Sequence, residues 1–203
     1  MTTSAPAAAV RDVRFRIVDA LHIGTGDART DEHDRQVACV LRDAGGPVVP
    51  GSTLKGVLRS RVEYVCRVCG VDACAGSAPP ACPADRPCPP CRLFGRAGET
   101  GGRGGRRAAV AVADSRIVAP VPETRTHVAL DRFTGGARDQ LLFTDDVVTA
   151  GWFRITVEAL DGALTAVDTA LLDAALTDLD AGLVGIGSRT TAGYGTVRID
   201  DPR

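Results

Sequence analysis

The stretch WFRITVEALDGALTAVDTALLDAALTDL, residues 152–179, changes its hydrophobic period from two to 3.6 along its length. In its first part, Phe153, Ile155 and Val157 alternate with Trp or polar neighbours, which is typical of a half-buried strand. In its second part the apolar residues recur at helical spacing, so we expect a helix over 164–179. The predicted buried face of this helix consists of Val167, Leu171, Ala174 and Ala175.

The rest of the chain repeats this alternation of strands and helices. Residues 13–23 alternate as a first strand. A helix capped by Ser52 follows and ends near Gly70, with one face formed by Leu54, Val57, Leu58, Val62 and Val65. Residues 108–118 and 196–199 are further strands. The order approaches β-α-β-β-α-β, which predicts an α+β, RRM/ferredoxin-like domain over residues 12–203 after a disordered tail over 1–11.

Length and charge limit the alternatives. The 203 residues suit one domain with an insertion. No apolar run is long enough to cross a membrane, so we expect no membrane partner and a cytoplasmic location. The net charge of -1 does not point to nucleic acid, but residues 86–107 hold six arginines and one acid. That stretch is either a solvated flexible loop or a phosphate-contacting loop.

Six cysteines lie between Cys66 and Cys91, in a sequence with no sign of a secretion signal. Such clustering indicates a metal rather than disulfides. Cys66 and Cys69 form one CxxC pair, and Cys88 and Cys91 form a second. Four thiolates suit a closed, structural zinc site, and an insertion over 66–91 without a core needs such a staple. Two other cysteines of this segment compete as ligands, so the ligand set stays open: Cys74 and Cys82.

Two segments carry features of phosphate-binding sites. The start of the predicted helix at Ser52 combines free backbone N–H groups, a positive dipole end and Lys55, the only lysine of the chain. An ordinary capped helix has the same spacing. The second segment, GIGSRTTAGYG at 185–195, has four glycines, an arginine and three hydroxyl residues besides its tyrosine. It is either a phosphate-binding loop or a plain connection between a helix and a strand.

One polar loop is crowded with acids and a histidine: Asp27, Asp31, Glu32, His33 and Asp34. Such a loop can hold magnesium or act as acid and base in phosphodiester cleavage. Most acidic loops are simply solvated, and the residues alone leave both interpretations open.

Taken in order along residues 13–199, these segments resemble the RAMP superfamily of RNA-binding CRISPR proteins. The resemblance rests on the first strand and its glycine turn, a motif that runs through the start of the first helix, a short LFG signature, the strand after it, a later Gly- and Arg-containing block and the C-terminal glycine loop. The matching segments are 21–26, 41–59, 91–95, 112–115, 127–137 with Leu142 and Phe143, and 185–195.

The resemblance is closest to the backbone subunits of type III CRISPR effector complexes, which line up along a guide RNA and pair it with target RNA. It implies partners of three kinds: guide RNA, target RNA, and other subunits of the complex, including copies of this chain. It also implies that a thumb-like hairpin near 131–137, with Arg132, interrupts the guide–target duplex. The implied contacts to guide phosphates are Ser52, Lys55, Arg59, Gly187, Ser188, Arg189 and Tyr194.

In active members of the family, an Asp in the loop after the first strand cuts target RNA with a divalent metal, here Mg²⁺. The family position falls near Val37, and the nearest acid is Asp34, with Asp31 further away. The chain is therefore expected to be either a ribonuclease subunit or a non-catalytic scaffold of the same complex. A guide-processing endonuclease fits the single-domain length less well. A zinc module unrelated to CRISPR leaves the glycine loop unexplained.

Overall fold

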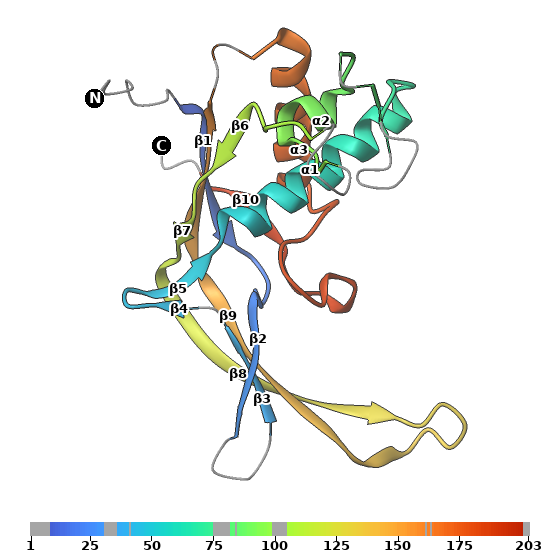
Figure 1. Cartoon of the computed structure of the whole chain (residues 1–203). Coiled ribbons are helices and arrows are strands. Elements are labelled where there is room, and N and C mark those ends of the chain that lie inside the picture. Colours follow the sequence, from blue (N-terminus) through green and yellow to red (C-terminus); the bar gives the residue numbers. More distant parts are fainter. Residues whose placement is uncertain are drawn as a thin grey trace.

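The computed structural model describes residues 9–30, 36–40, 42–74, 82–83, 85–98, 105–160, 162 and 164–200. It has the mixed α+β fold that the sequence predicts, with a mostly antiparallel main sheet (Figure 1). Four strands form the part of this sheet that carries the core. They are β1 (Ala9–Ile17), β6 (Val110–Val112), β9 (Ala137–Ala159) and β10 (Val197–Ile199).

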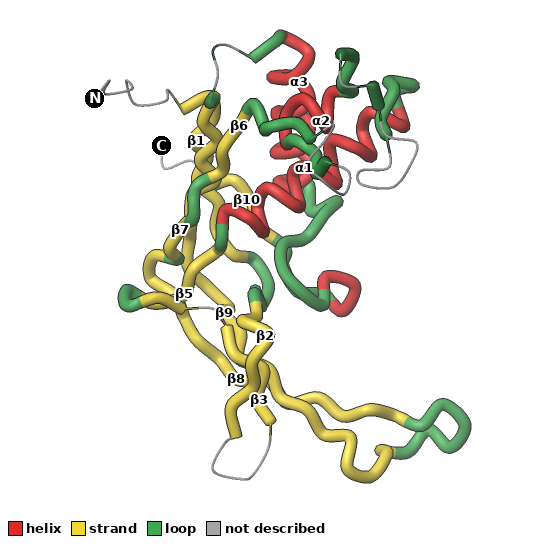
Figure 2. The backbone as a smooth tube through the Cα atoms, viewed as in Figure 1, coloured by secondary structure: helices red, strands yellow, loops and turns green. Residues whose placement is uncertain are grey.

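The spatial order of these strands is β10-β1-β9-β6, and each neighbouring pair is antiparallel. Helix α1 (Gly51–Val68) lies between β1 and β6 in the chain, and α3 (Ala166–Asp180) lies between β9 and β10. The chain therefore follows the predicted β-α-β-β-α-β order, with further elements inserted. The helices, including the short α2 (Pro89–Phe94), gather on one side of the strands (Figure 2).

The core lies between that face of the sheet and the helices. The rings of Phe15 and Phe153 stack at 6.2 Å, and both side chains are fully buried. Their neighbours Arg14 and Arg154 occupy the opposite face, because successive side chains of a strand alternate. From the helices, the buried side chains are Leu54, Leu58, Val62 and Cys66 of α1 and Leu171, Leu172, Ala175, Leu176 and Leu179 of α3.

Strand β9 is 23 residues long and belongs to two parts of the molecule. Its C-terminal part lies in the core sheet, while its N-terminal part pairs with β8 (Val118–Leu130) in a long hairpin that extends away from the helices (Figure 1). Gly151, with φ of +127°, lies where one part passes into the other. A Cβ there would lie 2.8 Å from Ile117, so the position requires glycine.

The remaining strands surround this hairpin base. Strand β3 (Gln36–Val40) pairs with β9 in parallel, Val37 opposite Thr144, and β2 (Gly24–Thr30) is the outer neighbour of β3. A small separate sheet contains β4 (Arg42–Asp43), β5 (Gly46–Val49) and β7 (Ser115–Arg116). A 3-10 turn, η1 (Thr190–Ala192), lies in the glycine loop.

Several predicted boundaries differ from the structure. The first strand begins at Ala9, inside the expected tail, and ends at Ile17 instead of Ile23. Residues 20–23 are instead a buried connection, with an isolated bridge from Leu21 to Val148. Helix α1 begins at Gly51 with Pro50 as N-cap, so the predicted cap at Ser52 is wrong. On α3, Val167 is 55% exposed because the neighbouring Asp168 turns inward to an arginine.

Among the described residues, no helix combines the length and the apolar character needed to cross a bilayer.

Candidate nucleic-acid interface and metal centre

The start of α1 is held tightly against the strand that precedes β7. The backbone N–H of Gly51 donates to Oδ1 of Asp114 at 2.7 Å. A Cβ on Gly51 would lie 2.1 Å from the carbonyl oxygen of Val112, so only glycine fits. The Asp114 carboxylate thus satisfies one of the free N–H groups at this positive helix end. Ser52 is exposed next to it.

Lys55 and Arg59, one helical turn apart, have different surroundings. Lys55 is half-buried and forms no ion pair with any residue that the structure describes. Arg59 binds Glu63 through Nε at 2.9 Å and donates from Nη1 to the carbonyl oxygen of Gly95 at 2.8 Å. Burial opposes the charge of Arg59, but the bond to Glu63 outweighs it and raises the arginine's pKa. Arg59 therefore ties α1 to the end of α2.

The glycine loop packs against the connection that follows β1. The N–H of Ser188 donates to the carbonyl oxygen of His22 at 2.9 Å, and that of Gly195 donates to Ala20 at 2.8 Å. Gly187 has φ of +88°, and a Cβ there would lie only 2.3 Å from the same His22 oxygen. The glycine at this position is thus required by a close approach between two segments of the protein itself.

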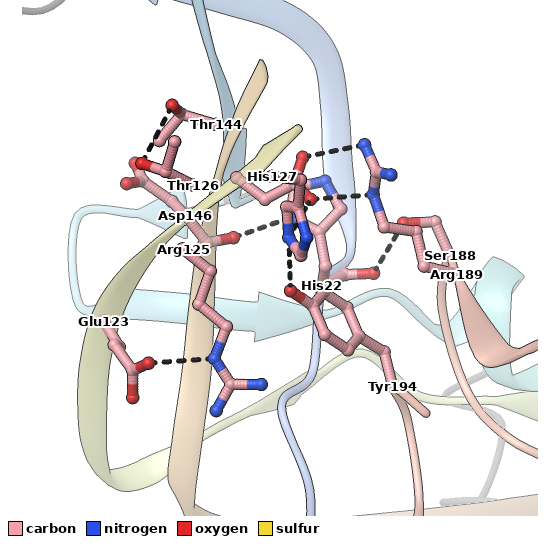
Figure 3. A network of polar contacts seen from close by, with 11 residues as sticks. His22, Glu123, Arg125, Thr126, His127, Thr144, Asp146, Ser188, Arg189 and Tyr194 are labelled. Atoms are coloured by element: carbon pink, nitrogen blue, oxygen red, sulfur yellow. Dashed lines mark hydrogen bonds and ion pairs between the residues drawn. The ribbon is translucent and has the colours of Figure 1, made fainter. Parts of the chain in front are cut away.

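A network of polar side chains joins this loop to the base of the hairpin (Figure 3). Arg189 contacts Asp145 of β9 with two nitrogens, Nε at 2.7 Å and Nη2 at 3.0 Å. Asp145 is 1% exposed, so its carboxylate is buried. Of the two contacts, only that from Nη2 to Oδ1 has hydrogen-bond geometry, and Oδ2 is paired with the guanidinium by charge alone. Nε2 of His127 lies 3.4 Å from the Asp145 carboxylate and 2.9 Å from the hydroxyl of Tyr194.

Aromatic contacts close the network. The ring of His127 stacks on Phe143 at 5.2 Å, and the guanidinium of Arg189 lies 4.7 Å from the centre of the same phenyl ring. Arg125 lies 5.5 Å from the centre of the Tyr194 ring and pairs with Glu123 at 2.8 Å. His22, itself buried, lies with Nδ1 2.6 Å from the carbonyl oxygen of Asp146. Asp145 was not among the residues predicted from the sequence. The signal that could have identified it is an acidic residue within an otherwise apolar strand.

The predicted phosphate contacts of the glycine loop are therefore engaged within the protein. Gly187 and Ser188 meet His22, Arg189 meets Asp145, and the buried Tyr194 meets His127. The exposed part of the loop runs from Ser188 to Gly193, and the 3-10 turn within it follows Arg189 directly. The loop presents this turn to solvent on a buried polar support.

The tip of the hairpin holds the predicted Arg132. Its guanidinium lies 4.8 Å from the ring centre of Phe133, which is 83% exposed. Backbone N–H groups of Thr134 and Phe133 donate to Oδ1 of Asp131 at 3.0 and 2.8 Å and lower the pKa of that carboxyl. A cation and an apolar ring are thus displayed together on an ordered turn.

The candidate catalytic acids Asp31 and Asp34 lie outside the described residues. The described strand that follows them, β3, pairs with β9 next to Asp145, with Ala38 opposite that residue.

Four cysteines form a compact group: Cys74, Cys82, Cys88 and Cys91, with all four sulfur atoms within 4.8 Å of one another. The sulfur of Cys74 lies 3.2 Å from Cys91, 3.6 Å from Cys88 and 3.9 Å from Cys82. Thiolates arranged tetrahedrally around zinc at 2.3 Å lie about 3.8 Å apart. The spacing therefore fits a metal such as zinc.

This group contains the predicted CxxC pair Cys88 and Cys91. In place of the other predicted pair it contains Cys74 and Cys82. Cys66 is buried in the core and Cys69 is exposed, and neither belongs to the group. Burial raises the pKa values of the Cys88 and Cys91 thiols, and neighbouring thiols add to the effect at Cys91. Without a cation these sulfurs therefore stay protonated, whereas a bound metal requires thiolates. A cavity of about 660 Å³ beside Cys74, Cys82 and Cys88 connects the group with solvent.

Arginines connect the cysteine group with the body of the protein. Nη1 of Arg96 donates to the carbonyl oxygen of Cys82 at 2.5 Å. Arg92, next to Cys91, binds Asp168 of α3 at 2.7 and 2.9 Å. Burial opposes ionisation of Asp168, but bonds from Arg92 and Thr165 outweigh it and lower the pKa of this carboxyl. The candidate metal centre is thus joined to both long helices.

Two arginines and the tryptophan on the opposite face of the core sheet are occupied by neighbouring side chains. Arg14 lies 4.0 Å from the ring centre of Trp152 and 2.7 Å from Asp200, and Arg154 pairs with Asp12 at 2.8 Å. Arg14 and Arg154 are thus paired with acids, and Arg14 covers the tryptophan, unlike the open aromatic rings of a sheet face that stacks RNA bases.

The fold and these sites define an α+β protein with an anchored glycine loop, a projecting hairpin and a four-cysteine group. The sequence model that describes the RAMP superfamily matches residues 14–198 of this chain, which is nearly its whole length. The chain belongs to the RAMP superfamily, the CRISPR-associated RNA-binding proteins, as its sequence motifs predict. No individual curated protein matches the sequence.

Proposed function

We propose that this chain is a guide-RNA-binding backbone subunit of a type III CRISPR ribonucleoprotein. Copies of it line up along the guide with other subunits and present the guide to target RNA, as part of antiviral defence in the cytoplasm. The observation that carries the proposal is the exposed turn of the glycine loop, supported by a buried network at the base of a projecting hairpin, in a chain of the RAMP superfamily.

Contacts to the RNA backbone supply most of the affinity in this proposal. Aromatic residues make up only 4% of the chain, so base stacking contributes little. Lys55, which lacks an ion-pair partner in the described part of the chain, and the exposed Ser52 reach guide phosphates at the start of α1. The turn after Arg189 adds backbone N–H groups. At the hairpin tip, Arg132 and Phe133 contact the RNA where guide and target pair.

The test is binding of a labelled single-stranded RNA at several KCl concentrations. Each phosphate contact of a single strand contributes about 0.7 to the slope of log K against log salt. Lys55→Ala is expected to weaken binding and to reduce the slope by about 0.7. The matched control is Arg154→Ala, a paired arginine on the opposite sheet face, for which binding stays unchanged. Equal slopes for wild type and Lys55→Ala would refute the contact.

Cleavage of target RNA is the second part of the proposal. Asp34, or Asp31, serves as the acidic group and Mg²⁺ as the cofactor. The support is the place of the described strand β3, which follows these acids and joins β9 at the base of the hairpin. The alternative is a non-catalytic scaffold subunit of the same complex, and the chain's described residues fit both.

Cleavage of a guide-complementary RNA by the reconstituted complex separates these alternatives. With Mg²⁺ present, Asp34→Ala is expected to abolish the cuts at this subunit's positions while guide binding is retained. Asp31→Ala serves as the comparison within the same loop. If the wild-type complex leaves the RNA intact at these positions, the scaffold alternative holds.

The cysteine group is proposed to hold one structural Zn²⁺. Four thiolates leave no open coordination position, so the ion stabilises the insertion and takes no part in RNA cleavage. Metal analysis of the purified protein is expected to find zinc, lost in Cys88→Ser and Cys91→Ser. Variants at Cys66 and Cys69 distinguish the observed group from the two-CxxC alternative.

A further inference from the structure

The glycine loop contains one arginine, whose side chain is 36% exposed and whose charge is paired with an acid of the protein itself. Arg189 contacts the buried carboxylate of Asp145 with two nitrogens, a hydrogen bond from Nη2 to Oδ1 and an ion-pair contact of Nε with Oδ2, and it packs on the ring of Phe143. Its backbone has φ of +56°, a left-handed conformation that is unfavourable for a residue with a Cβ. Such a conformation persists only where surrounding contacts impose it.

The contacts around Arg189 fix the loop at several points. Ser188 and Gly195 are bound to the connection after β1, and the N–H of Ala192 donates to the carbonyl oxygen of Arg189 at 2.8 Å. The exposed turn therefore starts from the residue that Asp145 holds. Asp145 in turn lies within the hydrogen-bonded register of β8 and β9, opposite Arg125, so its position is set by the hairpin.

We infer that Arg189 is a positioning residue: together with Asp145 it holds the exposed turn 190–193 in its RNA-binding position, and it does not itself contact phosphate. A guanidinium neutralised by a buried carboxylate releases no counterions when RNA binds, whereas the ammonium of Lys55, which has no ion-pair partner among the described residues, does. The RNA-binding half of this inference rests on the proposed function, and the structural half does not.

Hydrogen–deuterium exchange of the free protein tests the structural half without RNA. Asp145→Asn and Arg189→Lys are each expected to speed exchange at residues 190–194, because lysine keeps the charge but lacks the second nitrogen that contacts Asp145. The matched control is Arg11→Ala, which removes another arginine–aspartate pair, that with Asp173. It leaves exchange of the turn unchanged. Unchanged exchange in Asp145→Asn and Arg189→Lys overturns the inference.

RNA binding over a salt series tests the functional half with a labelled single-stranded RNA. Arg189→Ala and Asp145→Asn are expected to weaken binding by similar factors, about five- to tenfold, with the salt slope unchanged. The double variant is expected to bind RNA as well as whichever single variant has the lower affinity, because both changes release the same turn.

Two results distinguish a failure of this inference from a failure of the proposed function. If Arg189→Ala lowers the slope by about 0.7, as Lys55→Ala does, Arg189 contacts phosphate and the inference is wrong. If wild type binds no RNA while the exchange results hold, the positioning role stands and the proposed function fails. Retained far-ultraviolet circular dichroism and zinc content identify variants that are folded.

Discussion

The four-cysteine group and the glycine loop are held together by different kinds of contact. The insertion gathers four sulfur atoms around a point that a metal can occupy. The loop is ordered by a buried carboxylate, an arginine and glycines that allow close backbone contacts. The comparison teaches that the cysteine group is arranged so that a metal could hold it, whereas the glycine loop is held by residues far away in the sequence.

The largest expected effect is loss of the metal. Structural zinc sites contribute on the order of 10 kcal/mol of binding free energy, which is available for folding. Cys91→Ser, or a strong chelator, is therefore expected to lower Tm by on the order of 10 °C or more, measured by calorimetry. Cys69→Ser should leave both Tm and zinc content unchanged, because Cys69 is exposed and outside the group. Equal effects at both positions would mean that the ligand set is different.

The next effect separates close packing from backbone strain in the glycine loop. Gly187→Ala meets both a positive φ and the carbonyl oxygen of His22, so we expect a loss of about 2–3 kcal/mol in unfolding free energy. Gly193→Ala has a similar φ but open space around it, so about 1–2 kcal/mol is expected. Urea denaturation measures both. If the two losses are equal, the contact with His22 is not what holds the loop.

A third prediction concerns the bridge between the insertion and α3. The folded-state pKa of Asp168 is lowered, so its contribution is fully present above the unfolded value of about 3.9 and disappears as the pH falls through the folded value. Asp168→Asn should cost about 2 kcal/mol at pH 7, from the weakened bonds to Arg92. Denaturation from pH 7 to pH 2 should show this difference shrinking with acid. A difference independent of pH would assign the loss to packing instead.

The smallest effect is expected at Arg59. Arg59→Ala removes the bond to the carbonyl oxygen of Gly95 and should lower stability by about 1 kcal/mol. Because the guanidinium is already paired with Glu63, the salt slope of RNA binding should stay at the wild-type value. A reduced slope would mean that Arg59 contacts phosphate, as the family resemblance implies.

The sequence was sufficient to predict the structure where the local hydrophobic periodicity determines it. The alternation around Phe15 and Phe153 predicted which face of each strand is buried, and the family motifs predicted the superfamily. It was insufficient where distant residues meet. Nothing near Arg189 in the sequence indicates its partner Asp145, which lies 44 residues earlier. Spacing likewise identified cysteine as the ligand type, but the path of the chain decides which four sulfurs converge.

Strand β9 gives the hairpin a mechanical property. At about 3.3 Å per residue, an extended strand of this length spans roughly 75 Å, and it runs without a break from the hairpin tip into the core. Gly151 is the only described residue of this strand with a positive φ. The arm therefore changes direction where Gly151 of β9 lies beside Ala119 of β8, which has φ of +50°, and a force applied at the tip is transmitted past Asp145 before it reaches these two residues.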